Sequence, residues 1–357
     1  MAKILHAADF HLDSAFGALS EEQARQRRRE CRGLVNDMVD YANDHGAQLM
    51  LLAGDLFDSD DVYMQTGEEL AAALGRFDGH VVIAPGNHDY FGARSAYVRL
   101  PWPENVHIFT SADWQCVAFP QYGCTVWGAA FTGAEMPPLS SLASAGEGVR
   151  IGVLHGDVGM KDSKYRPITP QQIAESGLHY LALGHTHAFS GVQRSGSTDW
   201  AYPGCPEGRG FDELGDKGFL LGDVTEQGAD LRFVPFAKRL YQIMEIDVSE
   251  GIDTVEKALP PHTEDDIYRI LLTGETAEKL PLAKLQEELS GRFYQLELRD
   301  KTRLRQDIWE RCGEDSLRGL FLQNLRQQYD AAETDAERAR IEQAVRFGLA
   351  AMDNREM

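Results

Sequence analysis

Five short apolar runs within residues 1–190 end abruptly in histidine, aspartate or asparagine. Runs rich in Val, Ile and Leu are typical of buried strands, where an uncompensated polar group is costly. The polar residues that follow the five runs are Asp9, His11, Asp55, Asp58, Asn87, His88, Asp89, His155, Asp157, His185 and His187. Functional groups of open α/β sheets gather at the carboxyl ends of strands, so we expect these side chains to converge on one pocket.

Seven of these residues form a set of candidate metal ligands: Asp9, His11, Asp55, Asn87, His155, His185 and His187. Residues i and i+2 of an extended backbone point the same way, so Asp9 and His11 are expected to face the pocket together, as are His185 and His187. Imidazole, carboxylate and amide donors without a thiolate suit manganese, iron or zinc. Seven donors are too many for one ion and fit two ions that share one bridging carboxylate.

Two metal ions about 3.5 to 4 Å apart clamp the attacking and leaving oxygens of an in-line phosphoryl displacement and lower the pKa of a bound water to about 7. The set therefore predicts phosphoester hydrolysis. His88 follows Asn87 but should face away from the metal-binding side chain, free to stabilise the phosphate or protonate the leaving oxygen. We expect Asp89 to orient the imidazole of His88.

These residues must be positioned by the elements around them. Strands are predicted near ILHAA, LMLLAG and VVIAPG, separated by helices around residues 20–45 and 63–77. The following sequence, to about residue 235, is mostly strand and turn. This pattern predicts a layered α/β domain over residues 1–238.

Two further segments follow this domain. Residues 239–303 alternate strand and helix patterns as a small βαβαβ domain, and residues 304–357 read as helical. The helical segment has two apolar stripes, one with Leu317, Leu320, Phe321 and Leu325, the other with Ile341, Val345 and Leu349. The stripes either pack on each other as a helical hairpin or present a groove to a partner helix.

The motifs D-x-H, G-D-x-x-D, G-N-H-D, H-G and G-H-T-H, in this order over roughly the first 235 residues, resemble the calcineurin-like metallophosphoesterase superfamily. The stretches ILHAADFHLDSAF, LLAGDLFD and YPGCPEGRGFDELGDKG are most similar to bacterial SbcD and YhaO-type exonucleases, relatives of the double-strand-break nuclease. The resemblance implies an α/β fold with a two-sheet sandwich flanked by helices (αββα). It also implies an α+β capping domain at 239–303 that helps select DNA, and a helical region at 304–357 that docks on an SbcC-like coiled-coil ATPase.

The resemblance also implies roles for individual residues. One ion would be held by Asp9, His11, Asp55 and His187, and the other by Asp55, Asn87, His155 and His185. His88 would be the catalytic histidine. Archaeal and eukaryotic members carry a second catalytic histidine where this chain has Asp58, as bacterial relatives do, and we count Asp58 with His88 and Asp89 as the candidate catalytic residues. Arg209 and Lys217 are further candidates for contact with a phosphate, although Lys217 beside a turn glycine could simply close a hairpin.

Three functions fit these patterns. The first is a manganese-dependent DNA exonuclease or endonuclease that processes ends in double-strand-break repair with an SbcC-like ATPase, with iron or zinc as alternative metals. The second is a phosphoesterase with the same two-metal site that acts on a small phosphomonoester or cyclic nucleotide. The third is a scaffold with an inactive site, which the complete set of candidate ligands argues against. A homodimer is an open alternative.

Composition limits these functions. The 357 residues carry a formal net charge of −21, which opposes non-specific DNA binding, so DNA would have to be held locally by metal or by a partner. The basic stretch RQRRRECR fits a solvated helix face better than a DNA path. Five cysteines without a C-x-x-C pair indicate reduced thiols. The absence of a membrane-length apolar run and of a signal-peptide pattern predicts the cytoplasm.

The remaining histidines receive structural assignments. His6 lies within the first predicted strand and could orient a metal ligand, but buried packing explains it equally well. Taken alone, His155 could be a core histidine and G-H-T-H an exposed turn. The joint occurrence of five motifs in order is what favours a metal site.

Overall fold

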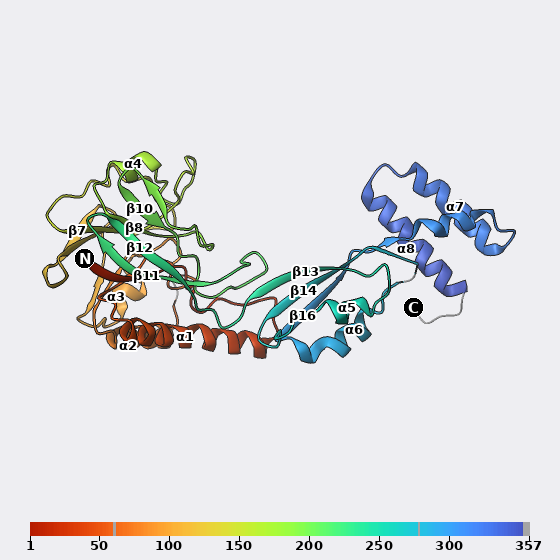
Figure 1. Cartoon of the computed structure of the whole chain (residues 1–357), viewed down its shortest axis with the longest axis horizontal. Coiled ribbons are helices and arrows are strands. Elements are labelled where there is room, and N and C mark those ends of the chain that lie inside the picture. The colour runs from red at the N-terminus through yellow and green to blue at the C-terminus, as the bar shows by residue number, and fades with distance from the viewer. Residues whose placement is uncertain (60–61, 278, 353–357) are drawn as a thin grey trace. The chain divides into compact units, whose positions relative to one another are not determined.

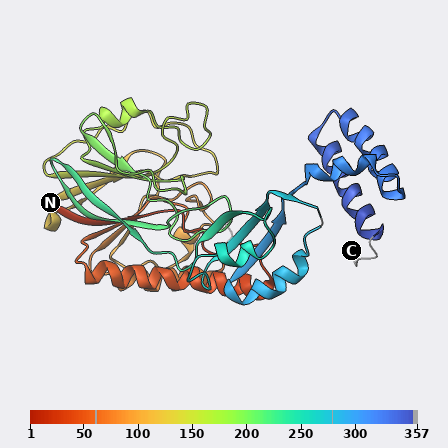
Figure 2. The same ribbon diagram turned by 45° about the vertical axis from the view of Figure 1, so that its right-hand side comes forward.

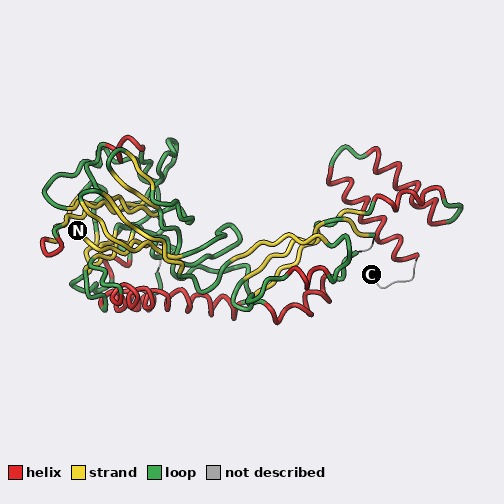
Figure 3. The backbone as a smooth tube through the Cα atoms, in the orientation of Figure 1, coloured by secondary structure: helices red, strands yellow, loops and turns green. Residues whose placement is uncertain are grey.

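The computed structural model describes residues 1–59, 62–277 and 279–352. The chain forms two compact units, Met1–Leu240 and Tyr241–Met357. Figure 1 shows the order of the elements along the chain, and Figure 3 shows where helices and strands lie in each unit. The division into three domains after residues 238 and 303 stays a prediction.

The first unit contains two six-stranded sheets. The first has the order β12-β11-β1-β2-β3-β4, in which β1 to β4 are parallel and β11 and β12 are antiparallel to their neighbours. Its strands are β1 (Ala2–Ala7), β2 (Leu49–Leu52), β3 (His80–Ile83), β4 (Val106–Ile108), β11 (Gly218–Thr225) and β12 (Gly228–Pro235).

The second sheet has the order β5-β6-β7-β8-β10-β9. Its four central strands are parallel and its two edge strands are antiparallel. The strands are β5 (Gln115–Phe119), β6 (Cys124–Gly128), β7 (Val149–His155), β8 (Tyr180–Gly184), β9 (Gln193–Ser195) and β10 (Thr198–Ala201). The long parallel runs explain the nearly continuous apolar sequences, because parallel strands are usually buried on both faces.

The two sheets pack face to face. Along β1, Ile4 enters the apolar cluster between the sheets, whereas Leu5 enters the cluster that the first sheet shares with the helices. This alternation follows from the two-residue period of a strand. Ile151 and Ala182 enter the cluster between the sheets from the second sheet, so both sheets contribute to the inner core.

Helices cover the outer faces of both sheets. The helices α1 (Glu21–Asp44) and α2 (Met64–Gly75) lie on the first sheet, and α4 (Pro170–Ala174) packs on the second. The layering is also visible after rotation (Figure 2). Shorter helices are α3 (Ala96–Arg99) and the 3-10 turn η1 (Pro120–Tyr122). The predicted two-sheet α/β sandwich flanked by helices is confirmed.

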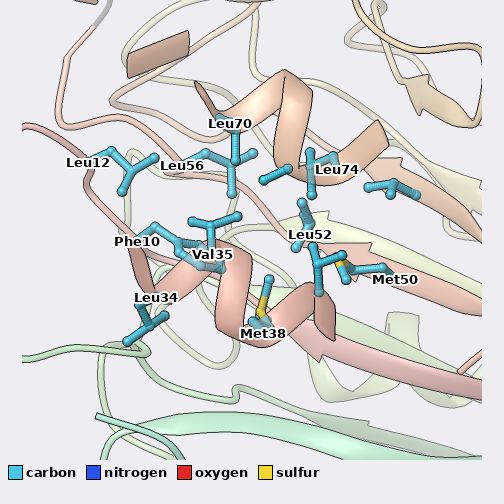
Figure 4. Packing of buried hydrophobic residues seen from close by; sticks show 14 of the residues in the cluster. Phe10, Leu12, Leu34, Val35, Met38, Met50, Leu52, Leu56, Leu70 and Leu74 are labelled. Atoms are coloured by element: carbon cyan, nitrogen blue, oxygen red, sulfur yellow. The ribbon is translucent and has the colours of Figure 1, made fainter. Parts of the chain in front are cut away.

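The helix α1 has clear sequence causes for its start and its orientation. Ser20 accepts a hydrogen bond from the Gln23 backbone, and the Gln23 side chain returns to Ser20 as a capping box. Val35 and Met38 lie on its buried stripe and pack with Leu70 and Leu74 of α2, as Figure 4 shows. The two long predicted helices are therefore present, with ends within a few residues of those expected.

The second unit begins with a parallel three-stranded sheet of order β13-β14-β16, whose strands are β13 (Tyr241–Asp247), β14 (Ile267–Thr273) and β16 (Gln295–Asp300). Apolar residues of α5 (Thr254–Ala258) and α6 (Leu282–Leu289), such as Val255 and Leu285, share one core with the sheet. The short strands β15 (Glu275–Thr276) and β17 (Arg303–Leu304) pair with each other, and a 3-10 turn, η2, spans Ser290–Arg292.

The last elements are helical: η3 (Gln306–Gly313), α7 (Leu317–Ala331) and α8 (Asp335–Met352). Their core centres on Trp309, Leu322 and Val345. The first predicted stripe is half right: Phe321 and Leu325 pack against this core, whereas Leu317 and Leu320 are 75% and 65% exposed and Leu322, outside the predicted stripe, is fully buried. The apolar residues of α7 lie on overlapping stripes, and contacts with both η3 and α8 decide which one is buried. No helix in the described part of the chain combines the length and apolarity of a membrane span.

Candidate metal centre

The candidate ligands lie where parallel strands of both sheets end. Asp9 and His11 follow β1, Asp55 follows β2, and Asn87 follows β3. His155 is the last residue of β7, and His185 and His187 follow β8. Of the seven, Asp9, His11, Asp55, Asn87 and His155 are all at most 8% exposed. The fold thus brings all seven predicted ligands to one edge of the sandwich.

One group of donors consists of Asp9, His11 and His187. The Nε2 atoms of His11 and His187 lie 3.2 Å apart, and His11 Nε2 lies 3.7 Å from Asp55 Oδ2. The backbone N–H of His185 donates to both carboxylate oxygens of Asp9 at 3.0 Å, which fixes that carboxylate.

A second group contains Asp55, His155 and His185 and extends to Asn87. Asn87 Oδ1 lies 2.9 Å from His155 Nε2 and 3.2 Å from His185 Nδ1. Asp55 Oδ2 lies 3.4 Å from His155 Nε2, in addition to its 3.7 Å approach to His11 of the first group. Asp55 therefore stands between the two groups, as a bridging carboxylate would.

Each of the four imidazoles directs one ring nitrogen into the cluster and the other to an acceptor outside it. The outer contacts are His11 Nδ1 to Asp58 at 3.1 Å, His187 Nδ1 to Glu213 at 2.7 Å, His155 Nδ1 to the Ala53 carbonyl at 2.9 Å and His185 Nε2 to Asp157 at 3.4 Å. Such acceptors hold the proton on the outer nitrogen. His11 Nε2 and His187 Nε2 then face each other as lone pairs 3.2 Å apart, an arrangement that a cation relieves. The donor set therefore fits metal ions.

The backbone is strained at four of the seven candidate ligands. Asp9, His11, Asp55 and His185 have φ values of 57°, 44°, 50° and 114°, a region that residues other than glycine rarely adopt. The expectation that the i, i+2 pairs face the pocket from extended strands is therefore wrong. These residues lie in turns beyond the strand ends. The left-handed backbone conformation of the turns, and not the alternation of side chains along a strand, directs them toward the pocket.

The charges of the cluster stabilise each other only in part. Burial raises the pKa of Asp9 to about 6 and lowers the pKa values of His11 and His185 to about 4. Burial alone would also lower the pKa of His155, but the carboxylate of Asp55 raises it to about 9. The site thus holds protons on buried groups that bound cations would displace.

His88 lies at the exposed rim of the cluster. Its backbone N–H donates to Asp55 Oδ1 at 2.9 Å, and its Nδ1 is 2.9 Å from the carbonyl oxygen of Asp58. Its ring meets that of His11 edge-on, with centroids 4.8 Å apart. His11, Asp58 and His88 also bring one donor atom each within 4.8 Å of one another. With Nδ1 donating to the carbonyl, Nε2 of His88 stays free for a substrate.

The prediction that Asp89 orients His88 is wrong. The buried carboxylate of Asp89 instead accepts hydrogen bonds from the backbone N–H groups of Asp55, Leu56, Phe57 and Gly86 and from the hydroxyl of Tyr97. The turn after β3 points Asp89 inward and His88 outward. Asp89 therefore joins the strand-end loops of β2 and β3, and the carbonyl of Asp58 orients His88.

Asp58 also contacts a candidate ligand with its side chain. Its Oδ1 lies 3.1 Å from His11 Nδ1 and accepts a hydrogen bond from Arg209 at 3.0 Å. A residue predicted to be catalytic thus positions two histidines, His11 through its carboxylate and His88 through its carbonyl.

The two predicted phosphate-binding cations have different surroundings. Arg209 is partly exposed and pairs with Asp58 and, at 2.8 Å, with Glu213, so its guanidinium lies beside the centre. Lys217 is only 3% exposed, and its Nζ donates to the backbone carbonyl of His187 at 3.0 Å. Burial leaves Lys217 no surface for a substrate, so that prediction is wrong and Lys217 fixes the His187 backbone instead.

Sequence reasoning missed Glu213. This carboxylate is 7% exposed and accepts from His187 Nδ1 and from Arg209. Its only signal is its place in the stretch RGFDELGDKG, where nothing local distinguishes it from Asp212 or Asp216. The contact between Glu213 and His187 joins residues 26 positions apart, so no local sequence pattern reveals it.

Other sequence alternatives are now decided. His6 is fully buried between Tyr180 and the Leu183 carbonyl, where burial lowers its pKa to about 3, so it is a packed core residue. Arg27 is also fully buried and pairs with Glu207, which contradicts a wholly solvated basic face on α1. Burial raises the pKa of the Cys205 thiol, in keeping with an unreactive residue.

Comparison with known proteins places these features in a wider group. A family model described as calcineurin-like phosphoesterase matches residues 2–189. The chain is also similar to the uncharacterized metallophosphoesterase YhaO of Bacillus subtilis (strain 168), with 31% identity over 261 residues. That match covers 69% of this chain and 63% of the relative, less than two thirds of its length.

Proposed function

The chain belongs to the calcineurin-like phosphoesterase family, a family of metal-dependent phosphoester hydrolases, and we propose that its substrate is DNA, which it cleaves with two manganese ions. The observation that carries a two-metal phosphodiesterase is the pair of donor groups on either side of Asp55. A single ion would leave one of these groups without a charge to compensate it.

The residues of this chain divide between the two ions. Asp9, His11 and His187 would hold one, and Asn87, His155 and His185 the other, with Asp55 shared. When bound, such ions clamp the oxygens of an in-line displacement and lower the pKa of an attacking water to about 7. The mixture of imidazole, carboxylate and amide donors suits manganese, and iron and zinc are the alternatives.

His88 would act on the substrate itself. Its Nδ1 is engaged by the Asp58 carbonyl, so Nε2 is the atom available to donate a proton to the leaving oxygen or to stabilise a phosphate oxygen. Asp58 contacts both His88 and His11 and so fixes the orientation of the two rings relative to each other. Arg209, held by Asp58 and Glu213, brings a positive charge to the same rim.

Three features support DNA as the substrate. The motif stretches resemble SbcD and YhaO-type exonucleases, and a second unit with its own sheet follows the phosphoesterase unit. The helices at the end of the chain expose Leu317, Leu320 and Phe347, which an SbcC-like coiled-coil ATPase would cover. The net charge of −21 predicts that this partner supplies most of the DNA affinity.

The same charge is the observation that favours the second candidate, a small phosphomonoester or cyclic nucleotide as substrate. A small ligand reaches the centre without a basic track on the protein surface. The two candidates share the centre and differ in what the second unit is needed for.

The test is degradation of linear DNA in the presence of Mn²⁺ by the full chain and three variants. His88→Ala should keep its bound metal and lose about 10²- to 10⁴-fold in rate. Asp55→Ala should lose both metal and activity. His107→Ala, a histidine in β4 outside the cluster, is the matched control and should behave like the wild type.

Equal cutting by all four proteins would refute the proposal. Hydrolysis of bis(p-nitrophenyl) phosphate without any DNA degradation would instead favour the small substrate. The partner is tested by asking whether an SbcC-like ATPase co-purifies with the wild-type chain and with the double variant Leu317→Asp/Leu320→Asp, which should lose it. Val98→Asp, at a 51% exposed residue of α3, is its control.

A further inference from the structure

We propose that a cavity beside the metal centre binds the base of a nucleotide whose phosphate occupies that centre. This inference rests on the proposed function, because it takes a nucleotide unit as the substrate. It adds a specificity-determining subsite to the reaction.

The cavity lies between the loops after β1 and β2 and the start of α2. Its volume is about 290 Å³, and its lining residues are Leu12, Asp13, Phe57, Asp58, Ser59, Val62 and Tyr63. That volume lies just below the usual range of small-ligand pockets, roughly 300 to 1,000 Å³. It therefore suits one planar ring system.

The walls have the character of a base-binding site. Leu12 and Phe57 are buried and apolar, and Val62 is half-buried. Tyr63 is 71% exposed, although an aromatic ring is usually buried. Tyr63 immediately precedes α2 and makes no side-chain capping bond there. An exposed ring at the mouth of an apolar cavity is suited to stack on a base.

Asp13 supplies a polar group for recognition. Its side chain is 11% exposed, and its Oδ2 is buried without a hydrogen-bond partner among the described residues. The nearest cation, Arg32, is 3.9 Å from the other carboxylate oxygen. An unsatisfied buried acceptor costs free energy that a ligand donor recovers. The amino groups of adenine, cytosine and guanine are such donors.

Asp58 connects the cavity to the metal centre. It lines the cavity, while its carboxylate contacts His11 and its carbonyl contacts His88. A ligand in the cavity is thus separated from the candidate ligand His11 by one side chain. A nucleotide with its phosphate beside His11 and His88 therefore has its base within reach of Tyr63.

The test is isothermal titration of the Mn²⁺-loaded full chain with dAMP, dCMP and dTMP, and with deoxyribose 5-phosphate as the matched ligand without a base. We expect dAMP to bind at least fivefold more tightly than deoxyribose 5-phosphate. Tyr63→Ala should reduce that preference by roughly 5- to 100-fold, the usual range for loss of one base-stacking contact. Tyr63→Phe, which retains the ring, should preserve it.

Two further variants sharpen the result. Asp13→Asn keeps the side-chain shape and tolerates the positive φ of 70°, and it should weaken dAMP and dCMP more than dTMP, which has no amino group. Met64→Ala, at the next residue of α2 and outside the cavity lining, is the control and should leave all affinities unchanged.

The outcomes separate this inference from the proposed function. Equal affinity for dAMP and deoxyribose 5-phosphate overturns the base-binding cavity, even if the chain degrades DNA. An equal loss in Met64→Ala and Tyr63→Ala overturns it as well. A base preference that depends on Tyr63, in a protein that does not degrade DNA, supports the cavity and refutes the DNA substrate.

Discussion

Asp55 is the residue on which both donor groups depend. Its Oδ2 approaches His11 of one group and His155 of the other, and its Oδ1 accepts the backbone N–H of His88. The carboxylate of Asp89 also accepts a hydrogen bond from the backbone N–H of Asp55. A carboxylate held at its backbone and at both oxygens is pre-organised for the bridging role proposed for Asp55, which would reduce the cost of assembling the site around the metals.

A substitution at Glu213 tests whether residues that contact the candidate ligands, without being ligands themselves, affect metal affinity. In Glu213→Gln the charged acceptor for His187 Nδ1 and Arg209 is lost. We expect the affinity for Mn²⁺ to fall about 10- to 100-fold, because such partners fix the orientation and basicity of a ligating imidazole. Equilibrium dialysis measures the affinity.

The control for this variant is Glu226→Gln, in the turn between β11 and β12. It should bind Mn²⁺ like the wild type. Thermal unfolding shows whether each variant is folded. A folded Glu213→Gln protein with unchanged affinity would mean that His187 needs no external orientation.

At the scale of elements, the two sheets approach each other closely where their strands end. A Cβ atom on Gly184, the last residue of β8, would lie 1.9 Å from the Ala53 carbonyl oxygen and 2.9 Å from the Ala8 Cβ. The absence of a side chain at Gly184 lets the loops after β1, β2 and β8 share one site.

Gly184→Ala should therefore push the sheets apart at the candidate centre. We expect a loss of stability of about 1 to 3 kcal/mol, the usual cost of overpacking, together with weaker metal binding. Gly33→Ala is the matched control, because nothing lies within 4 Å of a Cβ at that exposed position of α1. It should be neutral or stabilise the protein by up to about 1 kcal/mol. Denaturant unfolding and metal titration of both variants decide the matter.

The helix α1 also carries a buried group of charges at the end of the first unit. Glu30 pairs with Arg27 at 2.8 Å and with Arg239 at 2.7 Å, and Glu207 pairs with Arg27 and accepts the backbone N–H of Lys238. These contacts attach the chain that leaves β12 to the helix.

The stability of this group should depend on pH. Burial alone would raise the pKa of Glu30, but hydrogen bonds from Arg239 and Arg27 lower it from 4.5 to about 2. The folded state therefore binds fewer protons than the unfolded state, so the stabilisation is present above pH 4.5 and is lost as the pH falls toward 2.

Glu30→Gln tests this dependence. We expect the variant to be about 3 kcal/mol less stable than the wild type at neutral pH, with a difference that shrinks as the pH falls below 4.5. Thermal unfolding across pH measures it. Glu21→Gln, at an exposed position in the first turn of α1, should show neither effect. A difference that stays constant with pH would contradict the assignment.

At the scale of the whole molecule, each compact unit has its own apolar cores. Those of Met1–Leu240 lie between the sheets and beneath the helices, and those of Tyr241–Met357 lie beside β14 and around Trp309. Units with separate cores can unfold separately.

Metal removal should therefore affect one unit only. In differential scanning calorimetry, Mn²⁺ at about 100 times its Kd should raise the transition of the first unit by about 5 to 10 °C relative to protein with EDTA. The transition of the second unit should not move. Asp55→Ala should abolish the shift, which assigns it to the centre, and an equal shift of both transitions would contradict independent units.

The sequence by itself determined the fold class and the candidate ligands. Continuous apolar runs followed by His, Asp and Asn indicated buried strands with functional ends, and the pattern around residues 20–45 predicted the long helix that Ser20 and Gln23 cap in the structure. These are local properties, because strand burial and helix capping depend on residues within a few positions of each other.

Only the tertiary structure decided which groups hold the ligands in place and which way they point. Glu213 reaches His187 across 26 residues, and Asp58 reaches His11 across 47. Asp89 turns inward because Tyr97 and the loop after β2 receive it there, and Leu322 rather than Leu320 is buried because η3 and α8 pack on that side. Such contacts join residues far apart in the chain, and no local pattern encodes which of several polar or apolar neighbours the folded backbone will bring together.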